Sequence, residues 1–534
     1  MLKLKRFDKN KKKLNSKYVI IASIMLIFML SIFALYKSYA LYKVQEEYDV
    51  IKSRIGEFNN EDVILSYTVN GVKTDINFPS KESNYTVNSV ECSDGTTAGW
   101  DNTTWSLTNI TPGASKKIKC NIDFKGPYKE NILNGTDPVL SDNLVPVVLA
   151  DDGTVTKADT YSEWYSYENK KWANAVILSD NTQTYNNGDI IPEDNIESYF
   201  VWIPKYSYEI FNLGTTDGYT EETPTESIAH EINIKFGLNN TNDSNANECT
   251  TPMTSGASGN CSVGNYMTHP AFISMNTNGL WVAKFETTGD IANLSVKPGV
   301  TSLRSQTVKS MFEAAYNYKR DNDSHMMKNT EWGALAYLSH SKYGINTEVR
   351  INNNSSFLTG YAAVDGTDQS SYPGTYGTDS SITLPYNTET GYKASTTGNI
   401  TGVYDMSGGA YEYMSAYRKD TYGSSGFDAT SLADYNTKYY DEYDANSGWS
   451  THSKRILGDA TGEMGPFYYY QDKDGNNRQH NNWYADGSDF VYSSYPCFFR
   501  GGGYSNGVLA GQFHFGIDIG GANRHVSFRL VLAK

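Results

Sequence analysis

The sequence predicts an α+β fold: a large C-terminal domain rich in short strands, preceded by a small antiparallel β-domain and an N-terminal membrane-spanning helix. Three observations support this prediction. An uncharged apolar run lies near the N-terminus, apolar and polar residues alternate over 61–125, and only two stretches of the remaining chain have helical spacing. A chain of 534 residues is long enough for several folded units. The expected segments are 1–17 (basic, cytoplasmic), 18–36 (anchor), 37–60 (juxtamembrane helix or stalk), 61–125 (β-domain), 126–142 (linker) and 143–534 (C-terminal domain).

The first element is the apolar segment 18–36, YVIIASIMLIFMLSIFALY, which is long enough to cross a bilayer as a helix. The 17 residues before it carry eight basic side chains and one acidic one, although the whole chain has a formal charge of -15. The positive-inside rule therefore places the N-terminus in the cytoplasm and the rest at the cell surface. The alternative is a signal peptide cleaved after Ala40, which would give a secreted protein with the same topology.

The negative charge of the chain after its first 17 residues indicates which partners it can bind. Residues 18–534 carry a formal charge of -22, because the basic cluster lies in the first 17 positions and Asp and Glu outnumber Lys and Arg after it. Such a surface repels phosphate backbones, so we expect no nucleic-acid partner.

The β-domain at 61–125 follows the stalk. Segments such as VILSYTV, NYTVNSVEC and KKIKCNIDF alternate in polarity and are separated by Asn-Gly, Asp-Gly and Pro-Gly turns, which is typical of antiparallel strands. Four cysteines pair naturally by position, and outside the membrane such pairs are expected to oxidise. The predicted disulfides are Cys92 with Cys120 and Cys249 with Cys261.

Residues 126–142 contain Pro127, Gly135 and Pro138 and are predicted to form a linker. In the domain that follows, the spacing predicts helices over 308–320 and 328–341. The rest consists of short apolar runs and loops rich in Gly, Ser, Asn and Tyr, which indicates strands with long connections.

Three C-terminal motifs carry a family resemblance. They are GVYDMSGGAYEY, RGGGY and SFR, with matching residues Gly402, Tyr404, Asp405, Met406, Gly408, Glu412, Arg500, Gly501, Gly502, Tyr504, Ser527, Phe528 and Arg529. In order and spacing the segment from about Pro270 to the C-terminus resembles the formylglycine-generating-enzyme (sulfatase-modifying factor) domain. That resemblance implies a variant of the C-type-lectin fold.

The resemblance does not extend to the family's chemistry. The oxidase uses two nearby cysteines after the second motif, and this chain has no cysteine after Cys497. We therefore expect a protein that is not an enzyme. Asp405 and Glu412 could form a catalytic pair, but in this family they look like buried hydrogen-bonding residues that hold loops.

The C-terminal stretch also resembles the variable region of proteins diversified by retroelements. Between Tyr484 and Phe528 there is no Lys, Glu, Met, Trp or Thr, which fits adenine-directed mutation, and Cys497 fits as a drifted position. Tyr, Ser, Gly and Asn are also the residues favoured in antibody combining sites. A glycine-rich sheet that simply lacks the missing residue types is the competing explanation.

This resemblance implies a buried frame and a displayed surface. The expected frame residues are Arg500, Gly501, Gly502, Gly507, Ala510, Gly511, Phe513, Phe515 and Phe528–Leu532. The expected ligand-binding residues are Tyr504, Ser505, Asn506, Val508, Leu509, His514, Ile517, Asp518, Ile519, Asn523, Arg524 and His525.

The function expected from these residues is ligand binding at a bacterial surface, as a receptor or adhesin for a protein or glycan. The alternatives are a formylglycine-type or other redox enzyme and a structural component of the envelope. No cofactor is expected. A structural calcium ion is compatible with the loops rich in Asp and Asn oxygens.

Overall fold

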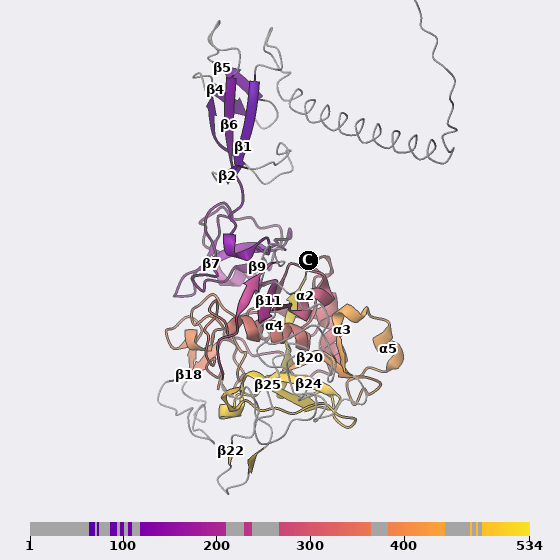
Figure 1. Ribbon diagram of the computed structural model, residues 1–534. Coiled ribbons are helices and arrows are strands. Elements are labelled where there is room, and N and C mark those ends of the chain that lie inside the picture. Colours follow the sequence, from indigo (N-terminus) through magenta and orange to yellow (C-terminus); the bar gives the residue numbers. More distant parts are fainter. Residues whose placement is uncertain are drawn as a thin grey trace, which may run out of the picture. The chain divides into compact units, whose positions relative to one another are not determined.

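The structure is a computed structural model that describes residues 63–69, 72–73, 86–92, 97–100, 105–108, 118–209, 229–237, 266–364, 383–443, 470–471, 477–478 and 483–533. The chain forms two compact units, Met1–Pro127 and Tyr128–Lys534, which are drawn in Figure 1. The predicted anchor at 18–36, the stalk at 37–60 and the Cys249–Cys261 pair lie outside the described residues. Within the described ranges, no helix is both long and apolar enough to cross a membrane.

Unit 1 contains a four-stranded sheet in the order β2-β1-β6-β3 and a separate hairpin of β4 and β5. The strands are β1 (Val63–Val69), β2 (Val72–Lys73), β3 (Thr86–Cys92), β4 (Thr97–Trp100), β5 (Trp105–Thr108) and β6 (Ile118–Lys125). The strand pattern is confirmed, but the expectation of a wholly antiparallel domain is wrong, because β1 and β6 pair in parallel. Two parallel strands must start at the same end of the sheet, so the chain has to return there between them. The connection 70–117 is long enough for this.

The first predicted disulfide is confirmed. Cys92 and Cys120 are bonded to each other and are also register partners on the antiparallel strands β3 and β6. The bond therefore joins two strands that already lie side by side.

Unit 2 is built around a seven-stranded, entirely antiparallel sheet in the order β17-β27-β14-β10-β9-β7-β8. Its strands are β7 (Val145–Leu149), β8 (Val155–Lys157), β9 (Asn174–Leu178), β10 (Ile196–Pro204), β14 (Gly279–Ala283), β17 (His325–Met326) and β27 (Leu530–Leu532). All residues of β9 and β14 are buried, so both faces of the sheet centre are covered.

A second sheet of unit 2 has five strands. These are β20 (Tyr411–Arg418), β21 (Asp441–Tyr443), β24 (Cys497–Gly501), β25 (Gly511–Asp518) and β26 (Val526–Phe528). The β20-β24-β25 pairs are antiparallel, whereas β21 and β26 each run parallel to β20. The smaller sheets contain β11 (Tyr206–Glu209), β12 (Ile234–Phe236), β13 (Tyr266–Thr268), β15 (Thr288–Asp290), β16 (Asn293–Ser295), β18 (Tyr361–Ala363), β19 (Thr383–Pro385), β22 (Tyr470–Gln471) and β23 (Asn477–Arg478).

The two predicted helices are confirmed, each ending two residues before its predicted end. The α-helices are α2 (Pro270–Met275), α3 (Val308–Tyr318), α4 (Asn329–Ser339) and α5 (Ala429–Ala433). The 3₁₀ turns are η2 (Asn131–Leu133), η3 (Glu193–Asn195), η4 (Arg320–Asn322), η5 (Gly391–Ala394), η6 (Thr437–Tyr439), η7 (Trp483–Ala485) and η8 (Gly507–Leu509). Thr307 caps α3 by accepting a hydrogen bond from Ser310 N at 3.2 Å.

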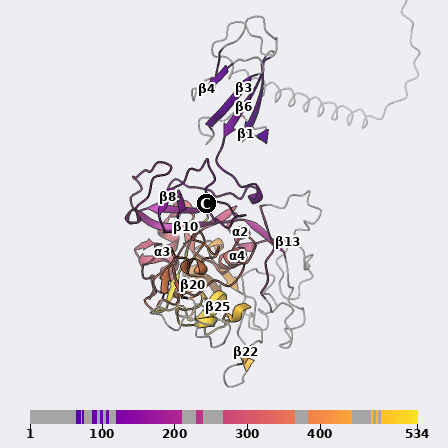
Figure 2. The same ribbon diagram turned by 90° about the vertical axis from the view of Figure 1, so that its left-hand side faces the viewer.

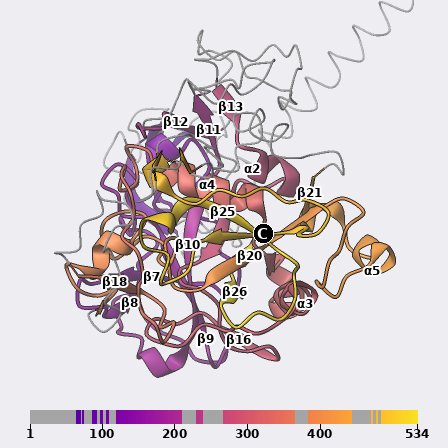
Figure 3. The ribbon, with the colours of Figure 1, turned by 90° about the horizontal axis from the view of Figure 1, so that it is seen from below.

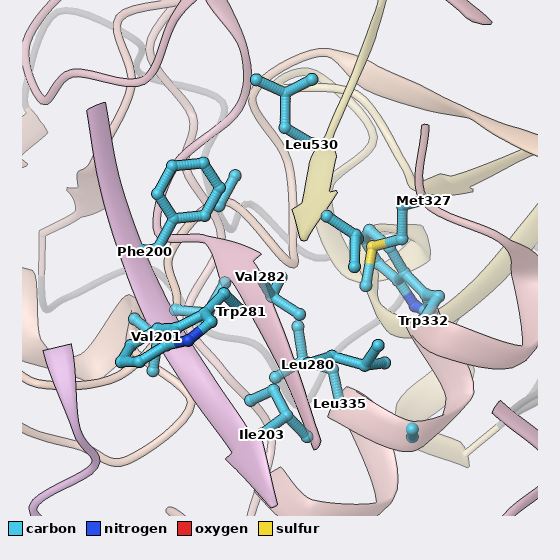
Figure 4. Packing of buried hydrophobic residues seen from close by; sticks show 14 of the residues in the cluster. Phe200, Val201, Ile203, Leu280, Trp281, Val282, Met327, Trp332, Leu335 and Leu530 are labelled. Carbon is cyan, nitrogen blue, oxygen red and sulfur yellow. The ribbon is translucent and has the colours of Figure 1, made fainter. Parts of the chain in front are cut away.

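Helix α4 is the central element of unit 2. All its residues except Thr330 are buried, because it contacts β10 of one sheet and β20 and β25 of the other. In Figure 2, α4 lies between β10 and β25, and in Figure 1 it lies above the β24–β25 pair. Figure 4 shows Ile203, Leu280 and Leu335 gathered between the seven-stranded sheet and this helix. Mixed helix and sheet with mostly antiparallel pairing agrees with the predicted α+β class.

The predicted linker at 126–142 is largely part of unit 2. Trp202 Nε1 donates to Thr136 O at 2.9 Å, and Trp281 Nε1 donates to Val139 O at 2.7 Å. Leu133 is fully buried. The indole groups of β10 and β14 thus hold this segment against the sheet, an interaction between distant residues that local composition does not reveal.

The three C-terminal motifs meet in the fold. Arg529 Nε and Nη2 donate to the carboxylate of Glu412 at 2.9 and 2.5 Å, and both side chains are fully buried. Glu412 pairs with Arg500 in the β20–β24 register, and Gly408 N donates to Gly501 O at 3.1 Å. The motif residues therefore form one buried junction between the two sheets.

Asp405 secures a loop at the same junction. Its Oδ1 accepts hydrogen bonds from Asn352 Nδ2 at 2.9 Å and from Gly360 N at 2.8 Å, and its Oδ2 accepts from Glu286 N at 3.3 Å. The expectation that Asp405 and Glu412 are buried hydrogen-bonding residues is confirmed.

Candidate ligand-binding face

The candidate site is the outer side of β20, β24 and β25 together with the loops 502–510 and 519–525, and is called the C-terminal face below. Figure 3 looks toward the end of unit 2 at which β20, β25 and β26 lie. Alternation along the strands determines which side chains point outward. Tyr411, Phe499 and His514 lie on the outer side. Glu412, Arg500 and Phe515 are register partners on the opposite side, where Arg500 bonds to α4.

The predicted frame residues largely form the inner side. Arg500, Phe513, Phe515 and Phe528 are each at most 1% exposed, and Arg500 Nη1 donates to Asn329 Oδ1 at 2.8 Å on α4. This side anchors the hairpin of β24 and β25 to the core, so the outer side is presented on a fixed support.

One glycine shapes the outer side. Gly516 is the register partner of Phe499, and a Cβ at Gly516 would lie 2.3 Å from Phe499 Cε2. The Phe499 ring therefore lies flat over β25 only because residue 516 has no side chain.

The predicted ligand-binding residues divide by exposure. The exposed ones are Ser505, Ile519 and Arg524; the half-buried ones are Tyr504, Asn506, Leu509, Ile517, Asp518, Asn523 and His525; the buried ones are Val508 and His514. Ten of the twelve therefore reach the surface at least in part. Val508 at 5% and His514 at 7% exposure are too covered to contact a ligand in this structure, which corrects their assignment as displayed residues.

His514 is covered for a clear reason. Its Nδ1 lies 2.7 Å from Leu509 O, a Cβ on Gly487 would come within 2.9 Å of its ring, and Phe499 stacks on it with centroids 5.9 Å apart. Burial lowers the pKa of His514 to about 4, so the ring is neutral at physiological pH. His514 thus supports the 502–510 loop from below.

Four half-buried rings and the buried ring of Phe357 lie at this face. The Tyr411 and Phe499 centroids lie 4.5 Å apart, and the Phe357 and Tyr504 centroids lie 4.9 Å apart in an edge-on arrangement. The His525 ring lies 5.9 Å from that of Phe357. These five residues are called the aromatic cluster.

Phe357 has a strained backbone. It is a bulky residue at φ 57°, in the left-handed region that side chains other than glycine seldom adopt. Such a conformation costs about 1–3 kcal/mol and persists where surrounding contacts hold it, often at ligand sites. Here the backbone is held by hydrogen bonds from Ser302 N to Phe357 O at 3.0 Å and from Phe357 N to Asn354 O at 2.9 Å, and the ring packs against Tyr504 and His525.

Asp518 ties the end of β25 to the following loop. Its Oδ1 accepts hydrogen bonds from Tyr413 OH at 2.6 Å and Gly520 N at 2.9 Å, and its Oδ2 accepts from Asn523 Nδ2 at 3.3 Å. The carboxylate therefore shapes the 519–525 loop, and most of its acceptor capacity is used within the protein.

Cys497 is fully buried, and burial beside Asp518 raises the pKa of its thiol, so it is not a thiolate at neutral pH. Among the residues that the structure describes, no group of three or more His, Cys, Asp and Glu side chains could hold a metal ion. Aromatic rings, amides and guanidinium groups are what the face presents.

Another hollow lies away from this face. A polar cavity of about 770 Å³ opens between α3 and the β15–β16 hairpin, where Tyr318 OH donates to Glu197 Oε1 at 2.6 Å. Its lining includes no residue of the C-terminal face.

Sequence reasoning missed part of the face. Tyr411 and Phe499 carried a usable signal, because each occupies an outward position of an alternating strand next to a recognised motif. Phe357 carried none, since it reaches the face from a loop more than a hundred residues before Tyr504, on which its ring packs. No protein-family model matches this chain, and no curated protein is significantly similar to it. The resemblance to the formylglycine-generating-enzyme domain stays a prediction.

Proposed function

We propose that this chain is a membrane-anchored surface protein whose C-terminal face binds a macromolecular ligand, a protein or a glycan, without catalysing a reaction. The observation that carries the proposal is the aromatic cluster, in which the half-buried rings of Tyr411 and Phe499 lie on the sheet and that of Tyr504 packs on the buried ring of Phe357. Large rings with few rotatable bonds give much contact area for little loss of entropy, as in antibody combining sites.

The surrounding residues support a binding role. Ser505 and Arg524 are exposed and Asn506 is half-buried, so hydrogen-bonding groups surround the rings. An apolar centre with a polar rim is the usual composition of a recognition surface. The surface location rests on the apolar segment 18–36 and the basic residues before it.

The absence of catalysis is part of the proposal. A two-cysteine copper site needs a second thiol near the RGGGY motif, and Cys497 is the last cysteine in the sequence. The C-type-lectin fold and the retroelement origin of the variable segment belong to the same proposal and rest on the motifs.

The proposal can be tested with the full-length chain in nanodiscs. Binding is measured to a displayed peptide library and to an immobilised glycan panel, and each hit is measured again with Tyr504→Ser. We expect a roughly five- to thirtyfold loss of affinity, because removing one ring from a recognition surface costs about 1–2 kcal/mol. Tyr185→Ser, which removes a half-buried tyrosine outside the face, is the matched control. Hits that bind Tyr504→Ser and wild type equally would place binding elsewhere.

A further inference from the structure

One corner of the C-terminal face is cationic. The Arg304 guanidinium lies 3.8 Å from the centroid of the Phe357 ring, and its Nη1 donates to Arg524 O at 2.5 Å. Arg524 is exposed, and its Nε donates to His525 Nε2 at 3.0 Å. Arg304, Arg524, His525 and Phe357 are called the cationic corner.

The two guanidinium groups have unused donors. Among the described residues, the other hydrogen bond of Arg304 is a long one of 3.4 Å from Nε to Ser302 O, and its Nη2 has no acceptor there. The two Nη atoms of Arg524 likewise have no acceptor in the part of the chain that the structure describes. Within the described ranges, neither arginine forms an ion pair, although arginine normally pairs with a carboxylate where one is in reach. Asp518 does not serve, because its oxygens accept from Tyr413, Gly520 and Asn523. The charge of Glu286 acts on Arg304, but this carboxyl is buried, forms no ion pair with Arg304, and its Oε1 accepts from Ala410 N at 2.9 Å.

The electrostatic environment of His525 agrees with this arrangement. Its pKa is lowered by partial burial and then by the charges of Arg524 and Arg304. The neighbouring charges that act on the ring are thus cations. This corner is positive in a chain whose formal charge is -15, so it is complementary to an anionic group rather than to the rest of the protein.

The loop that ends at the corner begins with an exposed apolar side chain. Cys497 pairs with Asp518, which places Ile519 at the end of the hairpin, and Tyr495 lies two residues before β24. These two residues are 42% and 41% exposed, and the loop that begins with Ile519 leads directly to Arg524. Ile519 cannot bond sugar hydroxyls, whereas it suits the apolar side chains of a protein partner.

We infer that the ligand of the C-terminal face is an acidic peptide segment of a partner protein, with a Glu or Asp carboxylate bound at the cationic corner and an aromatic side chain beside Tyr504. This inference rests on the proposed function and names the partner chemistry. A carboxylate would accept hydrogen bonds from the Nη atoms of Arg304 and Arg524 in a two-point contact. The neighbouring side chain would pack on the rings at the 4.5–7 Å centroid separations that aromatic pairs favour.

The test uses a random copolymer of glutamate and tyrosine as the probe, measured by interferometry against the full-length chain in nanodiscs. Wild type is expected to bind it more tightly than polyglutamate and to lose affinity as salt is raised. Arg524→Gln should weaken binding roughly fivefold, and Arg304→Gln with Arg524→Gln should weaken it further. Lys342→Gln removes one exposed positive charge outside the corner and should leave binding unchanged.

Several outcomes overturn the inference. A wild type that fails to bind the copolymer, or an Arg524→Gln variant that keeps full affinity and full salt dependence, removes the acidic-peptide ligand. Arginine-dependent binding of hyaluronan, a uronate polymer, without binding of the copolymer would identify a glycan instead. Arginine-dependent self-association on mass photometry would identify a second copy of the chain. Library hits that need Tyr504 but neither arginine would leave the proposed function standing and the inference wrong.

Discussion

Replacement of Arg529 by methionine tests the buried junction between the sheets. Arg529 donates to Glu412 at 2.9 and 2.5 Å, to Ala283 O at 2.9 Å and to Tyr404 O at 3.0 Å. Methionine fills much of the volume but donates nothing. Arg529→Met therefore leaves a fully buried carboxyl group and two carbonyls without their donor.

The magnitude follows from the charge that remains. Removing one partner of a buried ion pair typically costs about 3–5 kcal/mol, because the other charge has lost its compensation. Burial raises the pKa of Glu412 to about 7, with Arg529 opposing the shift and Asp405 adding to it. A carboxyl whose folded pKa lies above its unfolded value stabilises the fold fully below the unfolded value, and this contribution is lost as pH rises through the folded pKa. Without Arg529 the folded pKa rises further, so the loss deepens at higher pH.

The free energy of unfolding of unit 2 should therefore fall by about 3–5 kcal/mol at pH 8 and by about 1–2 kcal/mol at pH 5. Urea unfolding followed by the fluorescence of the buried tryptophans measures both values. A neutral amide needs no cation, so adding Glu412→Gln to Arg529→Met should recover part of the loss at pH 8. Equal losses at the two pH values, or a loss under about 1 kcal/mol at pH 8, would refute the ionic account of this junction.

Three further outcomes are expected. Cys92→Ser opens the bond to Cys120 and should lower the stability of unit 1 by roughly 3 kcal/mol, seen as faster hydrogen exchange in β3 and β6 with unit 2 unchanged. Cys497 should resist a thiol reagent until urea unfolds unit 2, with labelling located by mass spectrometry, and rapid native labelling would contradict its burial. Gly516→Ala should displace the Phe499 ring, lower stability by about 1–3 kcal/mol and weaken ligand binding, and an unchanged melting curve would show that the ring has room to move.

Local patterns in the sequence predicted the local structure well. The helices at 308–318 and 329–339 were found from spacing, and the Cys92–Cys120 bond from position. Helical spacing and strand alternation are imposed by backbone geometry, so they are visible in any short window of sequence. The parallel pairing of β1 with β6 was not visible, because strand direction depends on the route of the connection rather than on either strand.

For the candidate site, the motifs in the sequence and the resemblance they carry predicted a buried frame, and Arg500, Phe513 and Phe515 of that frame are buried. Only the tertiary structure decided what the outer side exposes. His514 also alternates outward, yet the 502–510 loop and Gly487 cover it. Phe357 reaches the same surface through contacts between segments distant in sequence. A strand's pattern sets the direction of a side chain, whereas its exposure depends on which other parts of the chain pack over it, and that is a property of the whole fold.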